Sequence, residues 1–152
     1  MFSIPLIFTF GNLFSGMCAV FFIMQGDSRA AAVFMLVAVA FDVLDGKIAR
    51  LLGQETKLGE YLDSLADIVS FGIPPAILIY NGSLFSMIIG MLFMGAGAYR
   101  LARFHVQKKV YRGMPITING VIVPIIIFSG FALLQYWLVL SAILMISTFK
   151  LR

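Results

Sequence analysis

The feature that most constrains this chain is a succession of apolar stretches, each close to the length that crosses a membrane as a helix. About 20 helical residues span the roughly 30 Å of hydrocarbon in a bilayer. The chain is 61% hydrophobic and 12% charged, and its mean hydropathy of +1.02 is far above that of a soluble domain. We therefore expect an all-α integral membrane protein, a bundle of about six transmembrane helices. The expected spans are 4–25, 30–51, 59–80, 84–104, 116–134 and 136–149.

No linker, internal repeat or low-complexity tract divides the sequence, so residues 1–152 are expected to form a single transmembrane domain. The first stretch lacks the basic start and cleavage site of a signal peptide, and we expect it to stay in the mature protein. The last span has about 14 residues, or roughly 21 Å of helix. It is therefore expected either to pack against a partner or to precede further chain.

Basic residues gather in alternate loops, which predicts that both termini and the two basic loops face the cytoplasm. The formal charge of +4 fits the anionic headgroups of a cell membrane better than nucleic acid, because the basic residues lie at helix ends. The basic residues are Lys47, Arg50 and Lys57 between the second and third spans, Arg100, Arg103, Lys108, Lys109 and Arg112 between the fourth and fifth, and Lys150 and Arg152 at the end.

Four aspartates lie within otherwise apolar spans: Asp42, Asp45, Asp63 and Asp67. A carboxylate within a membrane costs several kcal/mol unless it is paired, hydrated or bound to a metal, so such residues are candidates for a functional site. All seven acidic residues of the chain precede position 68. The acidic chemistry is therefore expected in the first half of the sequence.

The spacing of the aspartates predicts that they converge. Asp42 and Asp45 are three residues apart and Asp63 and Asp67 four apart, so each pair shares one helix face, and a short turn joins the two helices. Four like charges in a medium of low dielectric constant need compensation, and hard oxygen ligands favour Mg, Mn or Ca. We expect a site for two divalent cations, with room left by the small residues Gly46, Ala49, Gly59 and Ser70 on the same faces.

Two other interpretations of the aspartates remain open at this point. They could be protonated, or paired with Lys47, Arg50 and Arg103 to hold helices together. Alternatively, the chain could be an ion-coupled membrane transporter, which also places carboxylates within spans. The sequence lacks the paired repeats and broken helices that are typical of such transporters.

The aspartates belong to a longer pattern: Asp42-Val-Leu-Asp45-Gly46-Lys-Ile-Ala49-Arg50, eight residues, Gly59, three residues, Asp63, three residues and Asp67. This pattern resembles the signature of the CDP-alcohol phosphotransferase family without a mismatch. The segment from Asp63 to Ala76 looks like the phosphatidylserine synthase branch of that family, as does Asn12-Leu-Phe-Ser-Gly16.

The resemblance implies a catalytic domain with the CDP-alcohol phosphotransferase fold, a six-helix core, and an active site open to the cytoplasm. The implied reaction transfers a phosphatidyl group from CDP-diacylglycerol to an alcohol and releases CMP; a homodimer is implied as well. Carried over by position, Asp42, Asp45, Asp63 and Asp67 would hold two metals, and Asp67 would also deprotonate the attacking hydroxyl. Gly46, Ala49 and Gly59 would line the CDP pocket, where Arg50 is expected to contact phosphate. Apart from the resemblance, Asn12 could either contact the nucleotide base or make a contact between helices.

L-serine is the acceptor that the resemblance favours, and its carboxylate calls for a cation. Arg103 is the preferred candidate and Arg100 the second, although both could instead be anchors at the membrane surface. Ser70 is a further candidate for the acceptor pocket. Glycerol 3-phosphate or an inositol phosphate remains an alternative acceptor, and the donor could carry ether-linked chains, as CDP-archaeol does. His105 has no partner at ligand spacing on its helix, so we expect it to have only a boundary role.

Overall fold

The computed structural model describes residues 4–107 and 113–147, and every regular element in these ranges is helical. This confirms the expected all-α class. The elements, in chain order, are α1 (Ile4–Met24), α2 (Ser28–Leu52), α3 (Lys57–Asp67), the π-helical segment η1 (Ile68–Gly72), α4 (Ile73–Leu78), α5 (Leu84–Val106), the 3₁₀ turn η2 (Ile116–Ile118), α6 (Asn119–Phe128) and α7 (Leu134–Ile146).

Three helical runs in the described ranges are long and apolar enough to cross a membrane: α1, the continuous run Lys57–Leu78, and α5. Two shorter apolar runs follow, Ile116–Phe128 and Leu134–Ile146. The helix α2 has 25 residues but carries several charges, among them Asp42, Asp45 and Lys47. Its charged end is the part that contributes to the site described below.

A tight connection places α2 and α3 next to each other. Gly53 ends α2 with a left-handed backbone, at φ 60°, and Thr56 caps α3 by accepting a hydrogen bond from the amide of Gly59 at 3.0 Å. The chain therefore reverses between residues 53 and 56. As a result, the last turns of α2 face the first turns of α3, and the two aspartate pairs meet.

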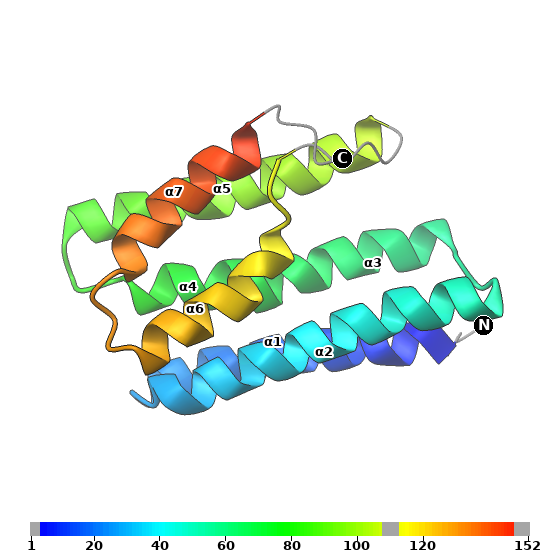
Figure 1. Ribbon diagram of the computed structural model, residues 1–152, viewed down its shortest axis with the longest axis horizontal. Helices are drawn as coiled ribbons and strands as arrows, with labels where there is room; N and C mark the ends of the chain where they lie inside the picture. Colours follow the sequence, from blue (N-terminus) through cyan, green and yellow to red (C-terminus); the bar gives the residue numbers. More distant parts are fainter. Residues whose placement is uncertain (1–3, 108–112, 148–152) are drawn as a thin grey trace.

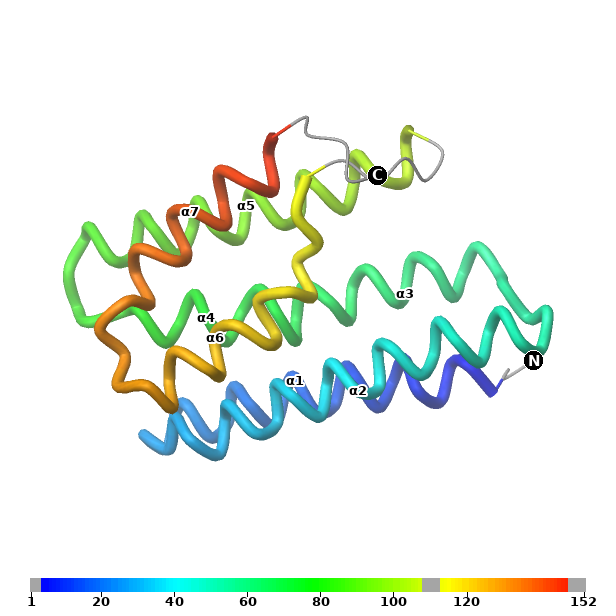
Figure 2. Tube along the Cα trace, in the orientation of Figure 1, coloured from blue at the N-terminus to red at the C-terminus, as the bar shows by residue number. Residues whose placement is uncertain are grey.

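The run from α3 to α4 changes its hydrogen-bond register just after Asp67. Pro74 and Pro75 have no amide hydrogen, so the α-helical bonds to the carbonyls of Ser70 and Phe71 cannot form. The amide of Ile73 instead bonds to the carbonyl of Ile68, five residues earlier, which is π-helical geometry. Figure 2 shows the trace continuing through this segment from α3 into α4.

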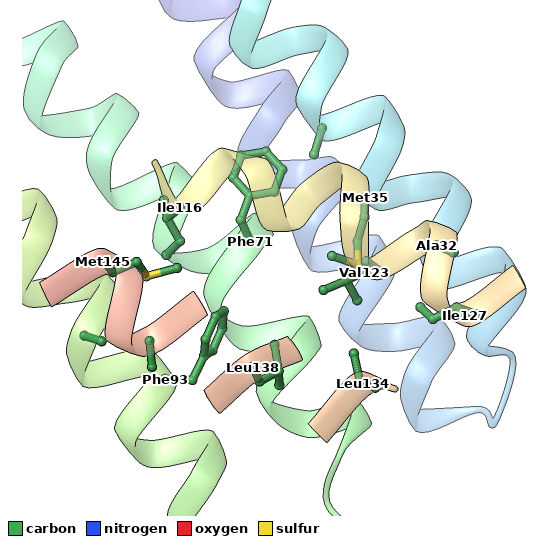
Figure 3. Close-up of a cluster of buried hydrophobic side chains, with 14 of the residues drawn as sticks. Ala32, Met35, Phe71, Phe93, Ile116, Val123, Ile127, Leu134, Leu138 and Met145 are labelled. Atoms are coloured by element: carbon green, nitrogen blue, oxygen red, sulfur yellow. The ribbon is translucent and has the colours of Figure 1, made fainter. Parts of the chain in front are cut away.

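The helices form two pairs with a middle layer between them. In Figure 1, α1 and α2 lie side by side along one edge, α5 and α7 along the other, and α3 and α4 run between the pairs. The short helix α6 packs against α2. Figure 3 shows the core at the centre, where Phe71, Phe93, Val123 and Leu138 from four different elements gather and are fully buried.

The expected span 116–134 is wrong at its end. Helix α6 stops at Phe128, and Gly130 and Phe131 both adopt a positive φ, of 104° and 65°, before α7 begins at Leu134. Hydropathy did not reveal this break because the residues that form it are themselves mostly apolar. Residues 148 and 149 of the expected last span lie outside the described residues, as do Lys108, Lys109, Arg112, Lys150 and Arg152.

Candidate active site

Three of the four aspartates converge where α2 faces α3. One carboxylate oxygen from each of Asp42, Asp63 and Asp67 lies within 4.8 Å of the other two. The convergence follows from the local spacing on each helix and from the tight turn between the helices. Asp45 lies one turn further along α2 and lines the same space as Asp63.

Helix α1 supplies hydrogen-bond donors to two of these aspartates. The Thr9 hydroxyl lies 2.9 Å from Oδ2 of Asp45, and Nδ2 of Asn12 donates to Oδ1 of Asp67 at 3.3 Å. Thr9 and Asn12 are three residues apart, so they share a face of α1. The other oxygen of Asp67, Oδ2, accepts from the hydroxyl of Thr117 in η2 at 3.4 Å. Asp67 is thus held from two sides.

Two adjoining cavities open onto the aspartates. The first, cavity 1, has a volume of about 220 Å³ and is lined by Gly46, Ala49 and Gly59 together with Thr9 and His105. The second, cavity 2, has a volume of about 300 Å³ and is lined by Asp42, Asp67, Lys47, Arg100 and Thr117. Residues that line both cavities include Asp45, Asp63 and Arg50. The two cavities therefore adjoin at Asp45 and Asp63, and Asp42 and Asp67 lie on the side of cavity 2.

The small residues of the sequence pattern keep this space open. At Gly46, a Cβ would meet only the guanidinium of Arg50, at 3.7 Å, and a larger side chain would extend into the cavities. At Gly59, a Cβ would lie 3.2 Å from the hydroxyl of Thr56 and disturb the cap of α3. The structure thus places Gly46, Ala49, Gly59 and Arg50 together on cavity 1, where the sequence predicts a nucleotide pocket.

The preferred acceptor cation, Arg103, is placed elsewhere. Its Nη1 donates to the carbonyl of Ile146 at 3.1 Å, and its Nη2 donates to those of Met145 and Ser147 at 3.3 and 3.0 Å. The last carbonyls of a helix have no amide partner within it, and the forked guanidinium satisfies several of them at once. Arg103 lines neither cavity, whereas the buried Arg100 lines cavity 2 beside the aspartates.

Two other residues of the expected site, Asn12 and Ser70, lie away from both cavities. Both are fully buried and line neither cavity. The hydroxyl of Ser70 donates to the backbone carbonyl of Asn12 at 2.9 Å, and a Cβ on Gly16 would come within 2.6 Å of the Cα of Ser70. The hydrogen bond of Ser70 therefore links η1 to α1, and Asn12 contacts the site through Asp67.

Two polar residues that contact the aspartates, Thr9 and Thr117, were not identified from the sequence. The sequence could have indicated Thr9, because it precedes Asn12 by three residues and therefore lies on the same helix face. Nothing in the sequence indicated Thr117, because its contact with Asp67 joins positions 50 residues apart. His105 lines cavity 1, with Nδ1 donating to the carbonyl of Leu101 at 2.9 Å and its ring stacked on Tyr61 at 4.8 Å. These contacts give its position, and its expected boundary role stays a prediction.

The donor set fits a hard divalent cation. Every candidate ligand is a carboxylate oxygen, the ligand type that Mg, Mn and Ca prefer. Oδ1 of Asp63 is shielded from solvent and has no hydrogen-bond partner among the described residues. A buried anionic oxygen without a donor is costly, and a bound cation would remove that cost.

The chain is similar to proteins of one family. The family model for CDP-alcohol phosphatidyltransferase matches residues 2–151. The archaetidylserine synthase of Methanothermobacter thermautotrophicus is 35% identical over 85% of this chain, and the CDP-diacylglycerol–serine O-phosphatidyltransferase of Bacillus subtilis is 31% identical over 83%. The transferase of the same name from Helicobacter pylori strain J99 is 32% identical over 81%.

The matched region spans different shares of these relatives: 59% of the archaeal protein, 76% of the Bacillus protein and 56% of the Helicobacter protein. The family match nevertheless covers nearly the whole chain, including all four aspartates and both cavities. The resemblance seen in the sequence is confirmed, and this chain belongs to the CDP-alcohol phosphatidyltransferase family.

Proposed function

We propose that this protein transfers a phosphatidyl group from CDP-diacylglycerol, or from an ether-linked equivalent, to L-serine and releases CMP. The observation that carries the proposal is that the two cavities share Asp45 and Asp63 while Asp42 and Asp67 line cavity 2 beside them, because a group transfer needs donor and acceptor to meet at one charged centre. The names of the bacterial and archaeal relatives support serine as the acceptor and leave both lipid types open.

In this proposal the nucleotide of the donor occupies cavity 1. Gly46, Ala49 and Gly59 provide room there, and their backbone allows close approach of a flat base and a ribose. Arg50 lines both cavities, so its guanidinium can contact the diphosphate at the junction. Asn12 contributes by holding Asp67 rather than by touching the base.

The four aspartates would hold two divalent cations, with Mg or Mn favoured and Ca as an alternative. When bound, such ions would neutralise the diphosphate and stabilise CMP as the leaving group. The arrangement of the aspartates supports this role because three carboxylates lie within 4.8 Å of one another and the fourth, Asp45, adjoins them. Hydrogen bonds from Thr9 and Asn12 keep two of these carboxylates oriented.

Asp67 is the proposed general base. The serine hydroxyl gives its proton to Asp67, its oxygen bonds to the phosphorus that carries the lipid, and the bond from that phosphorus to CMP breaks. Asp67 is suited to this role because it is buried, lines cavity 2, and has both oxygens fixed by donors from α1 and η2. A carboxylate held in one orientation is already positioned to accept the proton, which favours the reaction.

Arg100 replaces Arg103 as the proposed partner of the serine carboxylate. It is buried in the wall of cavity 2 that also holds Asp67. An acceptor whose carboxylate lies against Arg100 would therefore be in the same cavity as the base.

We further propose that the protein is a multi-pass, homodimeric enzyme of phospholipid biosynthesis in the cytoplasmic membrane, with both termini and the site on the cytoplasmic side.

The test is CMP release by purified protein in lipid nanodiscs with Mg or Mn. CDP-diacylglycerol or CDP-archaeol is supplied as donor, and serine, glycerol 3-phosphate, inositol phosphate or nothing as acceptor. Serine-dependent release is expected, and Asp67→Asn should reduce it about a hundredfold or more. Asp27→Asn is the matched control, because Asp27 only caps α2 and asparagine caps equally well.

Each outcome of this assay has a defined meaning. Release with another acceptor but not with serine would keep the group transfer and overturn the acceptor. Absence of metal-dependent release with every acceptor, from a folded and metal-loaded sample, would overturn the proposal. Ion flux without CMP release would then favour the alternative interpretation, an ion-coupled membrane transporter.

A further inference from the structure

Pro115 and Thr117 form part of the wall of cavity 2 and belong to a short segment, residues 113–117, that lies between α5 and α6 in the chain and contacts the end of α7. Gly113 and Met114, at its start, contact backbone carbonyls near the end of α7. The amide of Met114 donates to the carbonyl of Leu144 at 3.2 Å. Gly113 has φ 75°, and a Cβ there would lie 2.5 Å from the carbonyl oxygen of Met145. Only glycine fits this close approach.

Arg103 strengthens the same attachment. Its guanidinium joins α5 to the carbonyls of Met145, Ile146 and Ser147, the same end of α7 that receives Met114. The guanidinium also lies over the ring of Tyr99, 5.6 Å from its centroid. The end of α7 is thus connected to α5 through Arg103 and to the wall of cavity 2 through Gly113 and Met114.

The second part of the segment is fixed by Ile116. This residue is fully buried, and its Cδ1 atom would lie only 2.6 Å from a Cβ on Gly97 of α5 and 3.7 Å from one on Gly72 of η1. The side chain therefore fills a space that two glycines leave free. The neighbouring residue, Thr117, is consequently presented to the aspartates from a turn that is held at both ends.

Thr117 completes the support of Asp67. Its hydroxyl donates to Oδ2 of Asp67 at 3.4 Å, while Asn12 of α1 donates to the other oxygen, Oδ1, at 3.3 Å. One donor on each oxygen restricts rotation of the carboxylate about its last bond. Thr117 also lines cavity 2 beside Arg100, so it lies where the acceptor is proposed to enter.

We propose that Thr117 is a positioning residue that holds Asp67 in the orientation which receives the acceptor proton, with Arg103 supporting it through the end of α7. This inference rests on the proposed role of Asp67 as base. It assigns to Arg103 a different part from the acceptor contact expected from the sequence. Thr117 lies outside the lining of cavity 1, so the nucleotide subsite does not depend on it.

The test compares Thr117→Val with Thr117→Ser in nanodiscs. Valine keeps the shape of threonine without its hydroxyl, and serine keeps the hydroxyl. We expect kcat to fall about tenfold in Thr117→Val, the effect of one hydrogen bond to a charged group, and to stay within about threefold of wild type in Thr117→Ser. CMP binding, measured by calorimetry, and the KM for the donor should stay within about twofold in both.

The supporting role of Arg103 is tested in the same way. Arg103→Met removes the hydrogen bonds to the α7 carbonyls. It should lower kcat, as Thr117→Val does, and leave CMP affinity unchanged. In a Thr117→Val background, Arg103→Met should add less to the loss than it causes alone, because both act on Asp67 through one route.

Several results would overturn the inference. They are an unchanged kcat in Thr117→Val, an equal loss in Thr117→Ser, or a parallel loss of CMP affinity that reports general damage. Failure of the proposed function is a separate result, since the wild-type protein itself would then release no CMP.

Discussion

Thr9 offers the sharpest test of whether α1 supports the proposed cation site at the aspartates. The Thr9 hydroxyl is buried, lies 2.9 Å from Oδ2 of Asp45, and also reaches the carbonyl of Pro5 at 3.3 Å. Thr9→Val removes this donor and preserves the shape of the side chain. A hydrogen bond to a charged group contributes about 1.5–3 kcal/mol. Because the hydroxyl is shared with Pro5, we take the lower value, about 1.5 kcal/mol.

That energy corresponds to roughly a tenfold loss of metal affinity, the lower end of what removal of such supporting donors costs. The assay is titration of nanodisc samples with Mn²⁺, with free Mn²⁺ counted by electron paramagnetic resonance. Thr9→Ser retains the hydroxyl and should bind within about twofold of wild type. If Thr9→Val binds Mn²⁺ as tightly as wild type, or if Thr9→Ser binds as weakly as Thr9→Val, the reasoning about α1 is refuted.

Three further predictions concern packing and the acceptor. Gly113→Ala should unfold at a lower temperature than Gly26→Ala in a fluorescence-detected thermal melt. Both glycines have a positive φ, which destabilises an alanine by about 1–2 kcal/mol. A Cβ at position 113 would also clash with a carbonyl oxygen, whereas a Cβ at position 26 meets nothing within 4 Å. Equal midpoints would contradict this clash. Arg100→Met should raise the KM for serine at least about tenfold and leave CMP affinity unchanged, whereas an unchanged KM would exclude Arg100 from the acceptor subsite. Gly16→Leu should prevent α1 from packing on η1 and give aggregated protein in size-exclusion chromatography, while Gly95→Leu, where a Cβ meets nothing, should remain monodisperse.

The convergence of Asp42, Asp63 and Asp67 could be predicted because it depends on local geometry. Spacings of three and four residues place side chains on one helix face, and the connection between α2 and α3 is too short to allow anything but neighbouring, antiparallel helices. The same reasoning placed Gly46, Ala49 and Gly59 on the space beside them. Their roles in metal and nucleotide binding stay predictions.

The positions of Arg103 and of the break after α6 could not be predicted from local spacing. Arg103 was expected to contact the acceptor, yet its partners are carbonyls more than 40 positions later in the chain. Arg100 and Arg103 are three residues apart, and the sequence alone did not indicate which of them faces the aspartates. The break at Gly130 and Phe131 was missed for a related reason: hydropathy reports composition, whereas helix ends depend on backbone conformation.

The division of the site between the two halves of the chain has a consequence for how acceptor preference can change. The aspartates and the glycines of cavity 1 come from α2 and α3, and their supporting donors Thr9 and Asn12 come from α1. Arg100 and Thr117, by contrast, belong to α5 and η2 in the second half. Under the proposed function, substitutions confined to the second half would change the acceptor pocket around Arg100 and Thr117 and leave the residues proposed to bind the diphosphate unchanged. A chimaera that joins α1–α3 of this chain to the remaining helices of a relative with another acceptor would inherit its acceptor preference from the second part.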